Sequence, residues 1–124
     1  MGKLVDDTVL DGALNVIKNN ATQLIVCSDT PTNYSNATAT YDLATKVGLT
    51  SGNFTGPANG ASGRKLTVNQ AATLTVDHSG TATHIALCGA ANTLYYVTTC
   101  TSQVLTQGNT VTVPAWDIQI GDPT

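Results

Sequence analysis

The sequence predicts a mainly β protein: an antiparallel β-sandwich of the jelly-roll or immunoglobulin-like kind, with seven or eight strands and one N-terminal α-helix. Residues 81–120 are dense in β-branched and aromatic side chains, which favour pleated sheet, and only short Gly and Asn turns interrupt them. Three further runs, at 22–28, 64–68 and 72–76, carry the apolar residues expected of strands. Because 124 residues suffice for one ordinary domain and no linker interrupts them, we expect a single domain spanning 1–124.

The helix is predicted at residues 6–19. Its apolar residues repeat with the 3.6-residue period of one helix face: Val9, Leu10, Ala13, Leu14 and Ile17. Asp6 and Asp7 suit the positive end of the helix dipole, and one of them would cap the first turn. The apolar stripe indicates that this helix packs on a sheet or on a neighbouring subunit.

The strand at 22–28 is apolar on both faces, which indicates a central strand or one that the helix covers on its second side. Residues 29–40 form a loop by composition, rich in Asn and hydroxyl side chains around Pro31. Residues 41–47 fit either a weak strand or a short helix.

The segment 48–63 is predicted to be a long loop because it holds five glycines and a proline, and a short strand around residues 53–55 is an alternative within it. Loops of this length are usually functional or become ordered by a partner. It has no obvious place in a sandwich core, and neither has the extreme N-terminus. We therefore expect the partner-binding residues to be the apolar side chains of these two segments: Leu4, Val5, Leu49, Phe54 and Pro57.

The strands at 64–68 and 72–76 alternate cleanly, and the short connection between them predicts a hairpin. From residue 81 onward the pattern predicts a β-meander with turns at 89–92 and 107–109.

Composition excludes several classes of function. Only five residues are basic and the net charge is −3, so a surface that follows nucleic-acid phosphates is not expected. No apolar run approaches the roughly 20 residues of a membrane helix, and the N-terminus lacks the apolar core of a signal peptide. We expect the protein to fold in a cytoplasm. Charged residues make up only 10%, which suggests a surface that packs against other surfaces.

The three cysteines form no C-x-x-C pair. If the strands around Cys88 and Cys100 pair as a hairpin, Cys88 lies opposite Leu94 and too far from Cys100 for a disulfide. We predict free thiols, and a bridge from Cys27 across the sandwich is the main alternative.

No catalytic or metal-binding constellation emerges. His78 and His84 lack a third ligand at a zinc spacing, and the serines lack a G-x-S-x-G elbow. Nothing in the sequence places Asp77 near Asp117 as the paired carboxylates of glycoside chemistry require. We expect no enzyme activity, no metal and no cofactor.

The aromatic residues leave a binding role open. Trp116 is the only tryptophan, and Tyr95 and Tyr96 point to opposite faces of their strand. Trp116 either closes the sandwich core or serves as an exposed anchor for protein or sugar.

Several blocks of the sequence occur together: SGRKLTV at 62–68, SGTATHIALC at 79–88, the run from TLYYVTTC at 93 to the final DP, and the opening VDDTVLDGALNVIKNNATQLIVCS followed by PTNY. These blocks resemble a group of short proteins encoded in the virion-structure regions of tailed bacteriophages and prophages. The likeness covers nearly the whole chain, and its motifs are structural. It implies a capsid-associated or tail-associated protein with no catalytic residues to carry over.

The resulting hypothesis is a capsid decoration or cement protein, located on the capsid surface. Its partners would be the lattice of the major capsid protein and further copies of itself, with a trimer favoured. The alternatives are a tail or fibre-tip component, which would bind a receptor or sugar, and a stand-alone carbohydrate-binding module.

Overall fold

The computed structural model describes residues 4–121 and confirms the mainly β class, because strands account for 53% of the chain and pair antiparallel. Nine strands form rather than seven or eight, since one of them lies within the segment expected to be a loop. The elements are α1 (Asp7–Asn20), β1 (Ala21–Cys27), η1 (Asn36–Thr40), β2 (Asp42–Val47), η2 (Ser51–Asn53), β3 (Phe54–Asn59), β4 (Arg64–Val68), β5 (Ala71–Thr75), β6 (Gly80–Gly89), η3 (Ala90–Asn92), β7 (Thr93–Leu105), β8 (Thr110–Val113) and β9 (Trp116–Ile120).

One layer is a four-stranded antiparallel sheet in the order β2-β1-β6-β7. The strand β1 is central, as expected from its two apolar faces. The hairpin of β6 and β7 forms across the turn at 89–92. Glycine is required at position 89, because a Cβ there would collide with the carbonyl oxygen of Asn20 and the ring of Tyr95.

The second layer is a bent ribbon of two long strands. The chain runs from β4 into β5 through residues 69–70, and from β8 into β9 through residues 114–115. The strands β4 and β9 pair in one half of the ribbon, β5 and β8 pair in the other, and β3 adds to the outer side of β4. The predicted hairpin between β4 and β5 is therefore wrong, and the meander ends at β7. The two residues that connect β4 to β5, at 69–70, include no glycine or proline. They continue the direction of β4 instead of reversing it.

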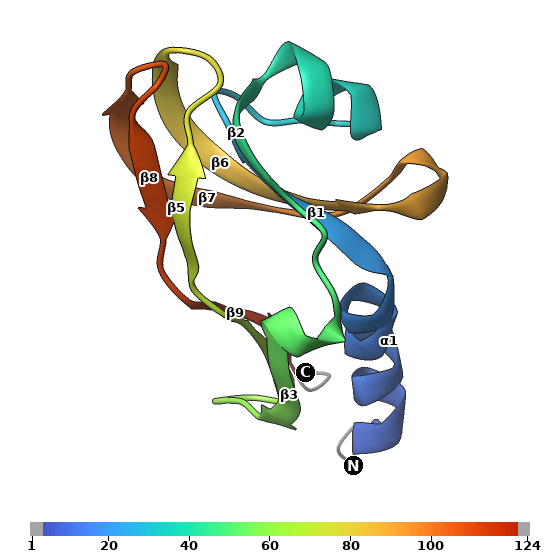
Figure 1. Ribbon diagram of the computed structural model, residues 1–124. Coiled ribbons are helices and arrows are strands. Elements are labelled where there is room, and N and C mark those ends of the chain that lie inside the picture. The colour runs from blue at the N-terminus through green and yellow to red at the C-terminus, as the bar shows by residue number, and fades with distance from the viewer. Residues whose placement is uncertain (1–3, 122–124) are drawn as a thin grey trace.

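The two layers are joined along one side and separate along the other. Ala44 of β2 bridges to Val76, which follows β5, and Leu43 accepts a backbone hydrogen bond from Asp77 at 2.6 Å. On the opposite side, β7 ends the four-stranded sheet without a strand partner from the ribbon among residues 4–121. Figure 1 shows β5 and β8 in front of β6 and β7, with α1, β3 and β9 at the lower end.

The helix α1 confirms the N-terminal prediction. Asp6 caps it by accepting a hydrogen bond from the Thr8 amide at 2.9 Å, and the helix ends at Asn20. Leu10 and Leu14 are its buried residues.

The segment 29–40 is a loop only in its first half. Its second half is the helical turn η1, and its buried Ala37 packs over the outer face of β1. The small core beneath it contains Ile25, Cys27, Ala86 and Cys88, with Tyr34 and Tyr41 at its margin. This turn, not α1, covers the second apolar face of the central strand. Residues 41–47, left undecided from sequence, supply the edge strand β2.

Truncating Leu14 should destabilise the fold strongly. This fully buried side chain belongs to the main core, so Leu14→Ala leaves a cavity that costs about 2–5 kcal/mol. The control is Val16→Ala, two residues along the same helix and half exposed, which should shift stability by about 0.5 kcal/mol or less. Urea unfolding of both variants measures the difference, and equal midpoints would contradict the packing of α1.

The three cysteines should all be free and should differ in reactivity. Burial, with a smaller contribution from Asp42, raises the pKa of Cys27 to about 12, and burial raises that of Cys88 to about 11. Cys100 is half-buried, and its pKa is raised as well. Cys88 pairs with Leu94 across the hairpin, as the sequence predicted, which keeps it from Cys100.

A raised pKa leaves less of the reactive thiolate at any given pH, so exposure decides which thiol reacts first. Without reductant, iodoacetamide at mildly alkaline pH should modify Cys100 in the native protein. Cys27 and Cys88 should react only after unfolding. Mass spectrometry that finds one modified cysteine in the unfolded protein would reveal a disulfide and refute this prediction.

Candidate partner-binding surface

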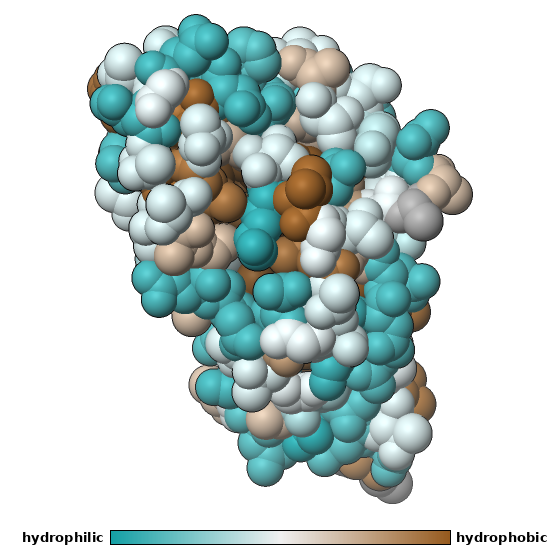
Figure 2. All heavy atoms as spheres, viewed as in Figure 1, coloured by the Kyte–Doolittle hydropathy of each residue, from teal (hydrophilic) through white to brown (hydrophobic). Residues whose placement is uncertain are grey.

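The outward face of α1 carries apolar side chains that no other described element covers. Leu4 is 93% exposed just before the helix, and Val9 and Val16, two turns apart, are 63% and 50% exposed. Ala13 is exposed between them on the same face. We call Leu4, Val9, Ala13 and Val16 the α1 strip. Figure 2 shows brown atoms along the outer side of α1, on a face that is otherwise mostly teal or pale.

The segment 48–63 lies against the opposite side of the same helix. Lys18 of α1 donates a hydrogen bond from Nζ to the carbonyl oxygen of Gly56 at 2.7 Å. Both η2 and β3 contact α1 directly. The two segments that the sequence singled out are thus brought to one end of the molecule.

The segment 48–63 is nevertheless not the open loop that was expected. Leu49 and Phe54 are only 6% and 5% exposed and belong to the main core. Phe54 opens β3 and pairs with Val68 of β4. The expectation that this segment has no place in the core is therefore wrong, and neither side chain offers surface to a partner. The short strand left open around residues 53–55 is present and longer, as β3, with the buried Phe54 as its first residue.

Of the remaining predicted residues, Pro57 and Val5 are partly buried and Leu4 is fully open. The exposed apolar surface therefore begins at Leu4, just before the helix, and continues along α1. The helical pattern already showed Val9 and Ala13 as apolar. It assigned them to the buried stripe, because a moderately wide stripe does not reveal which edge remains uncovered.

Arg64 fixes α1 to the sheet. Its Nε donates to Oδ1 of Asp11 at 2.7 Å, and its Nη2 donates to Oδ2 of the same carboxylate at 3.2 Å. Nη1 donates to Asn59 at 2.7 Å and lies 3.9 Å from the carboxylate of Asp7. The hydrogen bond to Asp11 raises the pKa of Arg64, so this cation persists at every working pH. A bidentate arginine–carboxylate pair sets orientation as well as proximity.

The histidines lie in separate hydrogen-bonded positions. His84 contacts the hydroxyls of Thr30 and Thr83 at 3.0 and 2.8 Å, and His78 Nδ1 lies 3.0 Å from the carbonyl oxygen of Asp42. Burial raises the pKa of the Asp42 carboxyl, while a hydrogen bond from Thr45 opposes that change. No group of three or more His, Cys or acidic residues within 4–121 is placed to hold a metal ion.

The candidate carboxylates lie on different elements. Asp117 is on β9 and accepts a hydrogen bond from Thr67 at 2.7 Å, whereas Asp77 follows β5 beside Leu43. Trp116 is partly buried and stacks on Tyr96, with ring centroids 5.8 Å apart and planes at 24°. Trp116 therefore borders the core without closing it completely.

Comparison with known proteins gives no relative: no family model, no curated protein and no solved structure matches the chain. In the part of the chain that the structure describes, no helix has both the length and the apolar character needed to cross a membrane.

Removing the Arg64 side-chain charge should loosen α1 without unfolding the sheets. In Arg64→Met the carboxylate of Asp11 loses its bidentate partner, so we expect a lower thermal midpoint and faster hydrogen exchange throughout α1. The control is Lys46→Met on the edge strand β2, which should leave α1 exchange unchanged. Unaltered exchange in Arg64→Met would show that apolar packing alone holds the helix.

Proposed function

We propose that the protein is a non-enzymatic virion structural component, a capsid decoration or cement protein that attaches to an assembled shell through the α1 strip. The observation that carries this proposal is the exposure of Leu4 just before α1 and of Val9 and Val16 along one side of this helix, whose other side is bonded to Arg64. Exposed apolar side chains gathered in one place are typical of protein-binding sites. The resemblance of the sequence blocks to phage virion proteins supports the same assignment.

The composition of the surface favours close packing on a lattice. Only 10% of the residues are charged, and hydroxyl and amide groups take their place. Burying such groups needs less desolvation than burying lysines or carboxylates, and it immobilises fewer long side chains. A small strip then suffices, because a shell presents many equivalent sites and modest contacts add up over them.

The proposed mechanism is mass action. A protein that binds the assembled lattice but not its dissociated subunits shifts the equilibrium toward the lattice. The proposal includes contacts between copies on the particle, with trimers favoured over dimers. The isolated protein is then monomeric, since single contacts of this size are weak.

Particle binding should depend on the α1 strip. Placing carboxylates on it in the double variant Val9→Asp/Val16→Asp forces charge into the interface, so binding to shells stripped of this protein should fall at least about tenfold. The matched control is Val47→Asp, a valine that is 68% exposed on β2, which should bind normally. Co-sedimentation with stripped particles measures both.

Deleting residues 1–5 should also weaken binding, because Leu4 is lost. Phe54→Ala is not a fair test of contact, since it truncates a core residue and lowers stability instead. Normal co-sedimentation of both the double variant and the deletion would remove the strip as the attachment surface. Electron microscopy that locates the protein at a tail or fibre tip would assign it to that site and contradict the proposed capsid location.

A further inference from the structure

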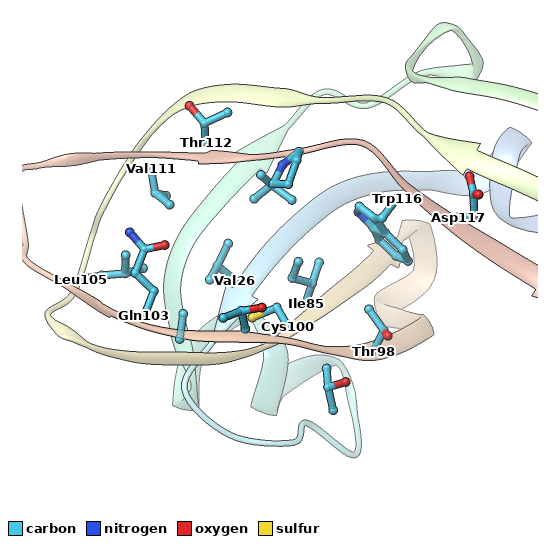
Figure 3. A pocket seen from close by; sticks show the side chains of 15 residues that line it. Val26, Ile85, Thr98, Cys100, Gln103, Leu105, Val111, Thr112, Trp116 and Asp117 are labelled. Atoms are coloured by element: carbon cyan, nitrogen blue, oxygen red, sulfur yellow. The ribbon is translucent and has the colours of Figure 1, made fainter.

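The side on which the two layers stay apart contains a pocket of about 440 Å³. This volume lies within the range of roughly 300–1,000 Å³ typical of small-molecule sites. The edge strand β7 forms one wall and the chain from β8 into β9 forms the other, while Val26 and Ile85 lie deeper between them (Figure 3). The pocket is a consequence of the fold: β7 has no strand partner from the ribbon in the described part of the chain.

Trp116 forms the aromatic part of the pocket wall. Tyr96 stacks on the indole, and Trp116 lines the pocket whereas Tyr96 does not. The nitrogen end of the ring is turned toward the other lining side chains (Figure 3). Its Nε1 is buried and has no hydrogen-bond partner within residues 4–121. An unpaired buried donor is unfavourable, but this nitrogen has almost no accessible surface, so a ligand in the pocket meets the ring of Trp116 and not its N–H group.

The polar groups around the pocket are almost all neutral. Thr98 supplies a hydroxyl and Gln103 supplies an amide that both donates and accepts, whereas the side chain of Thr112 points away from the cavity (Figure 3). The one lining carboxylate, Asp117, already accepts from Thr67 and lies 3.6 Å from Lys65 Nζ. The pocket therefore suits a neutral ligand with many hydroxyl groups.

We propose that this pocket binds a neutral saccharide, with a sugar ring against the indole of Trp116 and its hydroxyls bonded to Gln103 and Thr98. The apolar face of a pyranose ring matches the indole, and its edge matches the hydroxyl and amide groups. An apolar segment of a partner protein fits less well, because it would bury these polar groups without partners. The proposal concerns the isolated protein and is independent of attachment to a shell.

The protein contains one tryptophan and four tyrosines, so fluorescence excited selectively at tryptophan comes from Trp116, which lines this pocket. We would titrate the purified protein with glucose, galactose, mannose, N-acetylglucosamine, maltose and lactose. At least one of these sugars should change the emission of Trp116 saturably and slow the alkylation of Cys100, which also lines the pocket.

Gln103→Ala and Thr98→Val should each weaken binding of that sugar about five- to tenfold, as expected for the loss of one hydrogen bond. Gln107→Ala, in the turn outside the pocket, should bind like the parent. Circular dichroism confirms that each variant is folded, and two independent pocket variants guard against one that is not.

The absence of any response to the six sugars, in both fluorescence and alkylation, would overturn the proposal. A response that 1,6-hexanediol reproduces, or that neither pocket variant weakens, would also overturn it. Such a result would assign the pocket to an apolar occupant, such as a side chain of a neighbouring protein.

Discussion

The fold depends on one pairing arrangement, the antiparallel match of two long strands that each bend in the middle. The strand β4 continues into β5 while β9 and β8 follow it in the opposite direction, so one ribbon serves two halves of the molecule. Its β4–β9 half supports α1 and β3, with Leu66 and Val68 buried against them. Its β5–β8 half faces the four-stranded sheet. A change in register anywhere in this ribbon would turn buried side chains outward in both halves.

The same ribbon determines where the two candidate surfaces lie. It meets the four-stranded sheet at Ala44 and Val76, and this leaves the β7 side open as the pocket. At its other end, Arg64 ties α1 down so that the α1 strip points outward. The proposed attachment surface and the proposed ligand pocket therefore lie on different elements. Under the two proposals, a copy attached through the α1 strip would keep its pocket available.

The sequence predicted what local periodicity specifies. The helical repeat located α1, alternation located the inward residues Leu66 and Leu74, and the β6–β7 hairpin followed from its turn. Long-range pairing was missed, because no local signal states whether β4 pairs with β5 or with β9. A short strand around residues 53–55 was among the alternatives, but the glycines and Pro57 gave no sign that β3 runs to Asn59 and pairs with β4.

The candidate sites were only half predictable for the same reason. Leu4 could be named because an apolar residue in a polar, irregular segment is unusual. The pocket could not, because its walls come from β7, β8 and β9, and their separation depends on which edges the ribbon leaves unpaired. Trp116 showed that an aromatic group was present, but only the three-dimensional arrangement shows that Tyr96 covers one of its faces.

The free edge of β7 has a consequence for solubility. This strand runs for 13 residues without a charge, a proline or a glycine, which is the kind of edge that other chains extend into fibrils. Most proteins protect such edges with lysine. Here the ladder to β6 slips twice, between Ala82 and His84 and between Leu87 and Cys88. These bulges bend the exposed backbone of β7, so that it offers another chain a shorter straight template.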